Sequence, residues 1–463
     1  MFISLLQTIV RPIFGDFERE EFKKFIRMGL IFAFIIGSYW TIRVLKDSVF
    51  IGLVSKYDLW MAKTVSLFCL FPVVLIYTTL LNKFSREKMF YILSAFYGVA
   101  TIIFSFLLLS PLFGQAPAEV IAARTGLSWL ITKILGYGFY VFVESYGSLV
   151  VALFWAFASD ITMPESAKKG FSFVVAIGQL GGILGPLFIG SLPSRFGLET
   201  SFLALFAAAF AIISVAVLVK YFLMSTPANL LTSYEKEEKE EKEEPGFLEG
   251  LKLLLSHKYL FGIFAVLFFF EGIVTIFDYH FKILAGTNFS GAALDAYLGS
   301  YASMVNTVAL ICLLLGVSNI TRILGVGVAL ALMPIIVCGA LLGFLTLDSL
   351  TFLFWLMVGS KAINYSLNGP ALKQLYIPTS RDAKFKAQAW IETFGSRASK
   401  QAGSIFNSSL NPLIGRFGEA LGRTYHVWAA AGIGFLMVVV WFFVAIFLGK
   451  TYKKAVDEKK VVC

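Results

Sequence analysis

Apolar residues fill most of the chain in long runs, and short polar segments separate one run from the next. A helix needs about 20 apolar residues to cross the hydrocarbon core of a bilayer. Twelve runs reach that length, so the pattern predicts an all-α membrane protein with twelve transmembrane helices. The predicted spans are residues 28–54, 60–81, 89–114, 128–158, 171–192, 201–223, 259–284, 292–317, 323–346, 350–372, 386–412 and 427–449.

A strongly charged segment interrupts this pattern between the sixth and seventh runs. Residues 235–244 contain only glutamate and lysine, and Pro245 and Gly246 end the run. Such a run is typical of a solvated spacer. The predicted organisation is a cytoplasmic, interfacial N-terminal segment 1–27, a six-helix half 28–223, a charged cytoplasmic linker 224–256, a second six-helix half 257–449 and a basic cytoplasmic tail 450–463.

The two halves carry traces of one repeated sequence. Five residues recur at a constant offset of 214 positions, and the match joins the junction of the fourth and fifth helices to that of the tenth and eleventh. Parallel six-helix repeats of this kind characterise the major facilitator fold, in which the solute site lies between the halves. The matching residues are Pro164, Ser166, Phe171, Ile177 and Gly181, which recur as Pro378, Ser380, Phe385, Ile391 and Gly395.

Basic residues in short loops indicate how the chain is oriented. Lysine and arginine gather on the side of the N-terminus, for example at Lys83, Arg86 and Lys88, whereas the opposite loops offer few, among them Lys56 and Arg124. Cytoplasmic loops carry the excess of basic residues. We therefore expect both termini to be cytoplasmic, in a multi-pass protein of a bacterial inner membrane.

Composition excludes several classes of function. The chain has 463 residues, of which 58% are hydrophobic and 15% are charged, and the net charge of +10 reflects loop bias and not nucleic-acid binding. The four cysteines and three histidines have no metal-ligand spacing, and no glycine-rich phosphate loop follows a strand. We predict no enzyme activity, no metal and no cofactor. The expected partners are a small solute and the lipid bilayer, and we expect a monomer.

The first helix contains three ionisable residues that hydrocarbon does not tolerate. Arg43, Lys46 and Asp47 lie on one helical face, and each costs roughly 2.5–3.5 kcal/mol at a helix centre. One interpretation is a cationic wall for an anionic solute. The alternative is that Arg43 and Lys46 extend to the membrane interface while Asp47 neutralises one of them.

Ionisable residues recur in further predicted spans, and their number favours a multivalent anion over a neutral sugar. The alternative for any one of them is a structural ion pair or an interfacial position. We favour that alternative for Lys361, interpreted as close to a helix start, and for Glu271, which has no matched partner in the pattern. The spacing of Asp278 and Lys282 also permits an internal salt bridge. The whole set is Arg43, Lys46, Asp47, Lys63, Glu144, Glu271, Asp278, Lys282, Lys361, Glu392, Arg397 and Lys400.

Several of these residues stand in motifs that resemble the nucleotide transporter (ATP:ADP antiporter) family of intracellular bacteria and plastids. The motifs extend over nearly all of the membrane part. They are Arg43-Val44-Leu45-Lys46-Asp47, Lys63-Thr64, Glu144-Ser145-Tyr146-Gly147-Ser148, Phe154-Trp155-Ala156-Phe157-Ala158, Asp278 with Lys282, Tyr365-Ser366-Leu367, Tyr376-Ile377-Pro378, and Gly395 with Lys400. The resemblance implies that Lys46, Glu144, Asp278 and Lys400 bind nucleotide phosphates or govern exchange.

The predicted function is exchange of purine nucleotides, ATP for ADP, by alternating access. The alternative is proton-coupled net uptake of another nucleotide or of NAD. It is kept because Asn364 stands where the exchanger pattern has a lysine, and Gln374 where it has a glutamate. Tyr39, Tyr146 and Trp155 are candidates to stack on the base, and Asn364 is a candidate to bind the base edge. For any one of the aromatic residues we favour core packing. The predicted substrate-binding residues are Arg43, Lys46, Glu144, Tyr146, Asp278, Lys282, Asn364 and Lys400.

Overall fold

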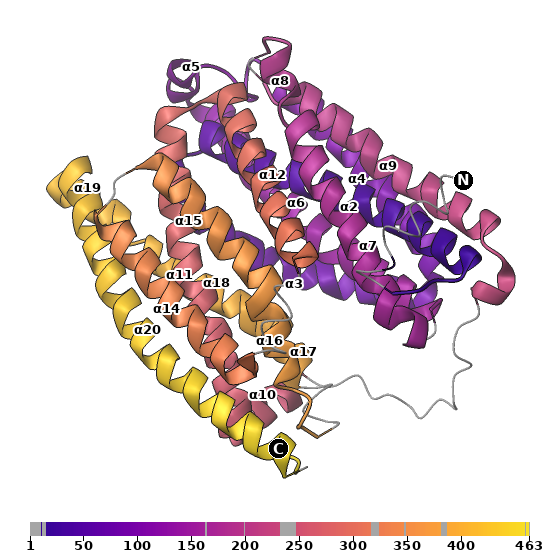
Figure 1. Ribbon diagram of the computed structural model, residues 1–463. Helices are drawn as coiled ribbons and strands as arrows, with labels where there is room; N and C mark the ends of the chain where they lie inside the picture. Colours follow the sequence, from indigo (N-terminus) through magenta and orange to yellow (C-terminus); the bar gives the residue numbers. More distant parts are fainter. Residues whose placement is uncertain are drawn as a thin grey trace. The chain divides into compact units, whose positions relative to one another are not determined.

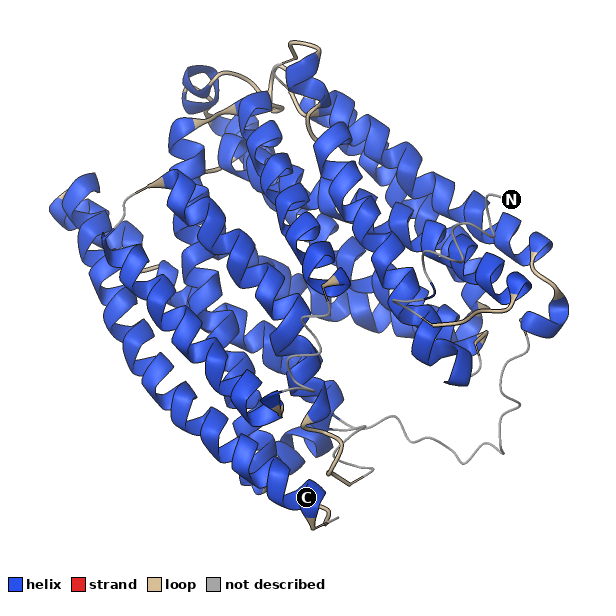
Figure 2. Ribbon diagram, viewed as in Figure 1, coloured by secondary structure: helices blue, strands red, loops and turns tan. Residues whose placement is uncertain are grey.

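The computed structural model consists of helices and their connections over the residues that it describes, and Figure 2 shows no strand among them. These residues are 11, 15–162, 164–198, 200–231, 247–315, 324–346, 349–380, 387–458 and 460–462. The charged run 235–244 lies outside them, so its role as a spacer stays a prediction. The all-α fold predicted from hydropathy is confirmed.

Ten helices in the described part are long and apolar enough to cross a membrane (Figure 1). They correspond to ten of the twelve predicted spans, and several exceed the length that a bilayer needs. They are α2 (Arg19–Leu53), α3 (Leu59–Lys83), α4 (Arg86–Leu108), α6 (Gly126–Asp160), α7 (Pro164–Leu184), α9 (Phe202–Ser225), α11 (Lys258–Asn288), α12 (Gly291–Leu314), α14 (Val326–Thr346) and α20 (Glu419–Asp457).

The other two predicted spans, 350–372 and 386–412, are composite helices. In the first, α15 (Leu350–Ile363) passes through a π-helical segment, Asn364–Asn368, into α16 (Gly369–Gln374). In the second, α17 (Gln388–Trp390) passes through a π-helical segment, Ile391–Gly395, into α18 (Ser396–Asn407). Segments of π-helix are rare and frequently mark functional sites. The remaining helical segments are Lys56–Asp58, α5 (Ala118–Ala122), Gly185–Ile189, α8 (Leu192–Arg195), Ala228–Leu230, α10 (Phe247–Ser256) and α19 (Leu410–Phe417).

The first long helix begins earlier than the apolar pattern indicates. It starts at Arg19, so residues 19–27 of the predicted interfacial segment belong to α2. Lys24 explains how this polar stretch is accommodated, because its buried ammonium donates to the carbonyl oxygens of Ile161 at 2.5 Å and Leu230 at 2.8 Å.

The chain divides into two compact units. The N-terminal unit comprises Met1–Glu238 with Ala285–Leu310, and the C-terminal unit comprises Lys239–Leu284 with Ile311–Cys463. Most of α12 thus packs with the N-terminal unit, where Ser201 donates to Asp295 at 2.6 Å and Ser303 donates to the Ile183 carbonyl at 2.8 Å. A division at the charged linker alone would place α12 with the second half.

Close contact between α2 and α7 organises the N-terminal unit. A Cβ added at Gly181 would lie 2.0 Å from the Ala33 carbonyl oxygen, and one added at Gly37 would lie 2.9 Å from the Gly181 carbonyl oxygen. The two backbones can approach this closely only where side chains are absent. This contact holds α2, which carries the first charged stretch, in a fixed rotation.

The C-terminal unit uses the same device between α14 and α20. A Cβ added at Gly449 would lie 2.5 Å from Gly327 Cα, so these helices also meet backbone to backbone. Helix α11 lies beside α20 through Phe270 and Trp441, whose ring centroids are 6.2 Å apart. These apolar contacts hold α11, which carries Glu271, Asp278 and Lys282.

Candidate functional site: buried charge clusters and a polar cavity

A buried lysine lies at the centre of the charged stretch of α2. The Lys46 ammonium is 3.0 Å from Asp47 Oδ1 and 3.0 Å from Glu144 Oε1, which α6 supplies. Its side chain is 3% exposed, and its Nζ lies 4.0 Å from the centre of the Tyr140 ring. A buried ammonium is tolerated when carboxylates neutralise it and an aromatic face contacts it. We name Lys46, Asp47 and Glu144 the N-cluster.

Arg43 lies one helical turn before this cluster and is half-buried. Its guanidinium donates to the Tyr39 hydroxyl at 3.1 Å and lies 4.9 Å from the centre of the Trp40 ring. The aromatic pair, which sequence alone could assign to a membrane interface, thus contacts the arginine directly. This contact orients Arg43 beside Lys46 on the same helix.

A buried carboxylate lies at the centre of the charged stretch of α11. Asp278 Oδ2 accepts from the Lys282 ammonium at 2.7 Å, and the Lys361 ammonium of α15 lies 3.6 Å from Asp278 Oδ1. The internal salt bridge that the spacing permits between Asp278 and Lys282 is therefore formed. We name Asp278, Lys282 and Lys361 the C-cluster.

The structure corrects the position assumed for Lys361 and supplies a partner for Glu271, and both residues form ion pairs, as the favoured alternative allowed. Lys361 lies in the last turn of α15, not near a helix start, and it faces Asp278. Glu271, for which the pattern offered no partner, lies 3.6 Å from the Lys400 ammonium of α18. Lys361 is thus a residue of the charged site that sequence reasoning set aside, because its partner is 83 residues away in the chain.

Lys400 is more accessible than the clustered lysines. Its side chain is 52% exposed, against 3% for Lys46 and 9% for Lys282. It follows the π-helical segment Ile391–Gly395 within α18, on a helix whose other face buries Ser399 and Gly403.

The two residues predicted to bind the base lie in different surroundings. Tyr146 is 1% exposed, its hydroxyl is 2.8 Å from Ser38 Oγ, and its ring packs edge-on against Tyr97. This placement favours the packing role over stacking. Asn364 is half-buried in the π-helical segment after α15, where its Oδ1 accepts from the Asn368 amide at 2.9 Å.

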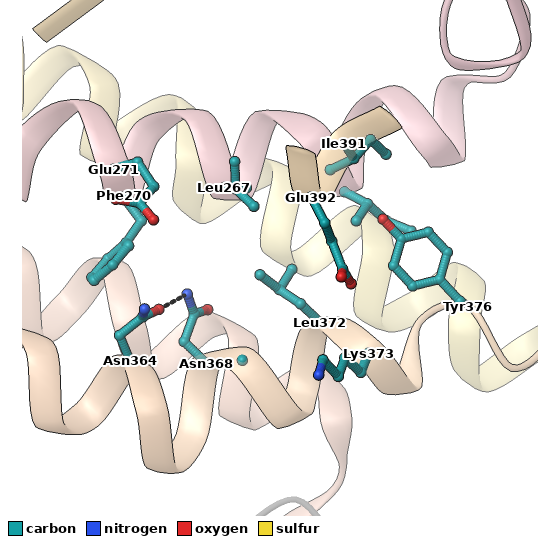
Figure 3. Close-up of a pocket in the computed structure, with 12 residues that line it drawn as sticks. Leu267, Phe270, Glu271, Asn364, Asn368, Leu372, Lys373, Tyr376, Ile391 and Glu392 are labelled. Atoms are coloured by element: carbon teal, nitrogen blue, oxygen red, sulfur yellow. Dashed lines mark hydrogen bonds between the residues drawn. The ribbon is translucent and has the colours of Figure 1, made fainter. Parts of the chain in front are cut away.

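Asn364 lines a cavity of about 150 Å³ in the C-terminal unit (Figure 3). Its polar walls come from Glu271 on α11, from both asparagines and from Glu392, and its apolar walls include Leu267. The volume is too small for a whole nucleotide, since drug-sized ligands occupy about 300–1,000 Å³. The cavity is named the C-cavity below.

Tyr376 also lines the C-cavity, just after α16. It is 4% exposed, and burial raises the pKa of its hydroxyl. The phenol therefore stays protonated at neutral pH and can both donate and accept a hydrogen bond.

Among the described residues, no group of three or more histidine, cysteine, aspartate or glutamate side chains could hold a metal ion. The Nε2 atom of His280 lies 2.8 Å from Nδ1 of His426. Both rings are buried, and they join α11 to α20.

The structure thus brings Lys46 and Glu144 together in one unit and Asp278 and Lys282 together in the other. Within the C-terminal unit, Lys400 is joined to the C-cavity through Glu271. The convergence of Arg43, Lys46, Lys282 and Lys400 into one phosphate pocket requires both units, and it stays a prediction.

The profile of the family described as TLC ATP/ADP transporter matches residues 6–452, which is nearly the whole sequence. The chain belongs to this family. Its relatives include ADP,ATP carrier protein 1 of Rickettsia bellii, 26% identical over 504 aligned positions that cover 99% of this chain and 98% of the relative. ADP,ATP carrier protein 4 of the same species is 23% identical and covers 95% of this chain and 92% of the relative. Membership confirms the resemblance seen in the motifs, and it makes the chain a transporter and not an enzyme.

Solved structures support the major facilitator fold for this member of the TLC family. A bacterial homologue of the iron transporter ferroportin, in an inward-facing state, matches with a TM-score of 0.61 at 12% identity, covering 92% of this chain and 98% of that one. A D-xylose–proton symporter matches with a TM-score of 0.59 at 14% identity, covering 90% and 96%. At such identities the likeness concerns the fold alone.

Proposed function

We propose that this TLC family transporter exchanges purine nucleotides, ATP for ADP, across a bacterial inner membrane by alternating access. The observation that carries the proposal is the N-cluster, in which a 3% exposed ammonium is kept between two carboxylates inside an apolar helix. Intramembrane charges are costly, and they are retained where a solute or ion uses them. A polyphosphate can compete with the carboxylates for the same ammonium.

In this proposal, Lys46, Glu144, Asp278 and Lys400 bind the phosphates or govern exchange. Lys46 and Lys400 contact phosphate oxygens, and the carboxylates hold the lysines charged while the site is empty. Arg43 and Lys282 extend the cationic surface, and Asn364 contacts the base. Tyr146 supports α2 through the Ser38 hydrogen bond.

The test is uptake into vesicles that contain the purified full-length chain. Vesicles loaded with unlabelled ADP should take up labelled ATP, and vesicles without internal nucleotide should take up little. Empty vesicles and vesicles with the Lys46→Gln variant are the controls. Absence of ATP, ADP, GTP and NAD uptake under all conditions would contradict the proposal.

Net uptake of another nucleotide or of NAD, coupled to protons, is the second candidate function. It is favoured by Asn364 and Gln374, which are neutral where the exchanger pattern carries charge. In that case uptake would proceed without internal nucleotide and would collapse when a proton ionophore is added. Uptake that requires internal ADP and ignores the ionophore would exclude it.

Orientation belongs to the same proposal and has its own test. With both termini cytoplasmic, a cysteine placed in residues 115–127 should react with an impermeant reagent added outside the cell. A cysteine placed in residues 235–244 should react only after the cells are opened. Labelling of both positions from one side would contradict the twelve-span topology. A monomer is expected, and a dimer by light scattering in detergent would contradict it.

A further inference from the structure

The C-cavity contains two buried polar atoms whose hydrogen bonds are not completed within the described residues. Asn368 Oδ1 and the Tyr376 hydroxyl have no hydrogen-bond partner there, and their side chains are 1% and 4% exposed. Buried polar atoms are nearly always satisfied, so each such atom calls for an explanation. A ligand that enters the cavity and supplies the missing bonds is one such explanation.

Acceptor atoms dominate the polar walls of the C-cavity. The Asn368 amide already donates to Asn364, so Asn368 offers its oxygen (Figure 3). The carboxylates of Glu271 and Glu392 add acceptor oxygens beside those that face Lys400 at 3.6 Å and accept from Gln388 at 2.8 Å. The ammonium groups of Lys373 and Lys400 balance the two carboxylates, so the cavity offers no excess positive charge to a phosphate group. The walls therefore fit an uncharged group that carries N–H donors.

Size and apolar lining narrow the class of ligand. A volume of about 150 Å³ equals roughly five water molecules at about 30 Å³ each, more than a single cation occupies and less than a nucleotide needs. Apolar side chains, among them Leu267, Phe270 and Ile391, line the remaining wall. A flat heteroaromatic ring with polar edges matches such a mixed pocket.

The C-cavity lies next to Lys400, which we propose contacts the phosphates. Glu271 lines the cavity and also lies 3.6 Å from the ammonium of Lys400. A ligand whose ring occupies the cavity would therefore present its charged end close to an exposed lysine of the same unit.

We propose that the C-cavity is a nucleobase subsite that selects bases with an exocyclic amino group, and that Asn368 and Tyr376 determine this selectivity. The inference rests on the proposed nucleotide transport. The amino group donates to Asn368 Oδ1, and the Tyr376 hydroxyl bonds a ring nitrogen. A base with a carbonyl in place of the amino group leaves the Asn368 oxygen unsatisfied.

The experiment compares uptake of ATP and inosine triphosphate, which share all phosphates and differ at the 6-position of the purine. Vesicles with the full-length wild-type chain should prefer ATP at least tenfold in kcat/KM, the range expected when a buried acceptor loses its donor. Asn368→Leu and Tyr376→Phe should each bring this preference down several-fold. In both variants, the kcat/KM for inosine triphosphate should stay within about twofold of the wild-type value.

Asn407→Leu is the matched control. Asn407 is a buried asparagine of the same unit whose amide donates to the Thr275 carbonyl at 3.4 Å, and it does not line the C-cavity. It should leave the preference for ATP unchanged. Thermal unfolding in detergent checks that each variant is folded, and Tyr376→Phe, which removes one oxygen, keeps the test decisive if Asn368→Leu does not fold.

Three outcomes would overturn the inference. Equal uptake of both nucleotides by the wild-type chain would do so while leaving nucleotide transport intact. An unchanged preference in both variants would do so as well. A preference that is unchanged while the variants lose a dependence on external sodium would assign the cavity to a cation. Failure of the wild-type chain to take up either nucleotide would instead contradict the proposed function.

Discussion

In the N-terminal unit a lysine lies between two carboxylates, whereas in the C-terminal unit a carboxylate lies between two lysines. Lys46 contacts Asp47 and Glu144, and Asp278 contacts Lys282 and Lys361. Lys46 and Asp278 each lie on the first long helix of their half, α2 and α11. The fourth predicted span of the same half, in α6 or α15, supplies one ion-pair partner, Glu144 or Lys361. The repeated fold thus keeps the place of the cluster and inverts its sign.

The comparison teaches what burial requires of a charged group. A buried charge needs an opposite partner, and either sign at the centre satisfies this need. The formal charge of the N-cluster is −1, and that of the C-cluster is +1. A polyanionic substrate should therefore be attracted more strongly to the C-cluster, and its approach to the N-cluster should depend on Arg43.

The largest expected effect is that of Lys46→Gln. The substitution removes the cation between Asp47, which is buried, and Glu144, whose side chain is 35% exposed. The free energy of unfolding should fall by about 3 kcal/mol, the low end of the range for a broken buried pair, because water reaches Glu144. Uptake should be abolished as well, because Lys46 is proposed to contact the phosphates. Thermal or denaturant unfolding in detergent, followed by tryptophan fluorescence, measures it.

The double variant Lys46→Gln with Glu144→Gln is the control for this prediction. Removing one of the two carboxylates should restore part of the lost stability without restoring uptake. Lys46→Arg should keep the charge but fail in transport, because its planar, longer side chain does not replace a compact ammonium. Stability equal to wild type in Lys46→Gln would contradict the role of the N-cluster.

Asp278→Asn should have a smaller effect, about 1–3 kcal/mol in the free energy of unfolding. Asparagine keeps one side-chain oxygen that can accept from Lys282, and the Lys361 ammonium already lies 3.6 Å from Asp278 Oδ1. Asp278→Glu, which keeps the charge, is the matched control and should stay close to wild type. A loss as large as that of Lys46→Gln would contradict this ranking of the two clusters.

Lys400→Gln should have the smallest effect on stability and a large one on transport. Its side chain is 52% exposed, and the 3.6 Å separation from Glu271 makes a weak ion pair. The free energy of unfolding should therefore fall by less than about 0.5 kcal/mol. ATP uptake should nevertheless be abolished. Lys450→Gln, at an exposed lysine of α20, should change neither quantity. Normal uptake by Lys400→Gln would assign the lysine a structural role.

Local features of the sequence determined most of the fold. The apolar runs predicted the ten long helices correctly, because the length and hydropathy of a span are properties of consecutive residues. The spacing of Asp278 and Lys282 permitted their salt bridge, which the structure contains. In the same way, the motifs around Lys46 and Glu144 were enough to indicate the family.

Only the tertiary structure decided which distant side chains meet. The pairs Lys46–Glu144, Lys361–Asp278 and Lys400–Glu271 join helices far apart in the chain, and they depend on the rotation and depth of each helix. Hydropathy does not encode these quantities, because packing against neighbouring helices sets them. For the same reason the sequence left Tyr146 open between stacking and packing, and it gave no sign of the C-cavity beneath the π-helical turn at Asn364.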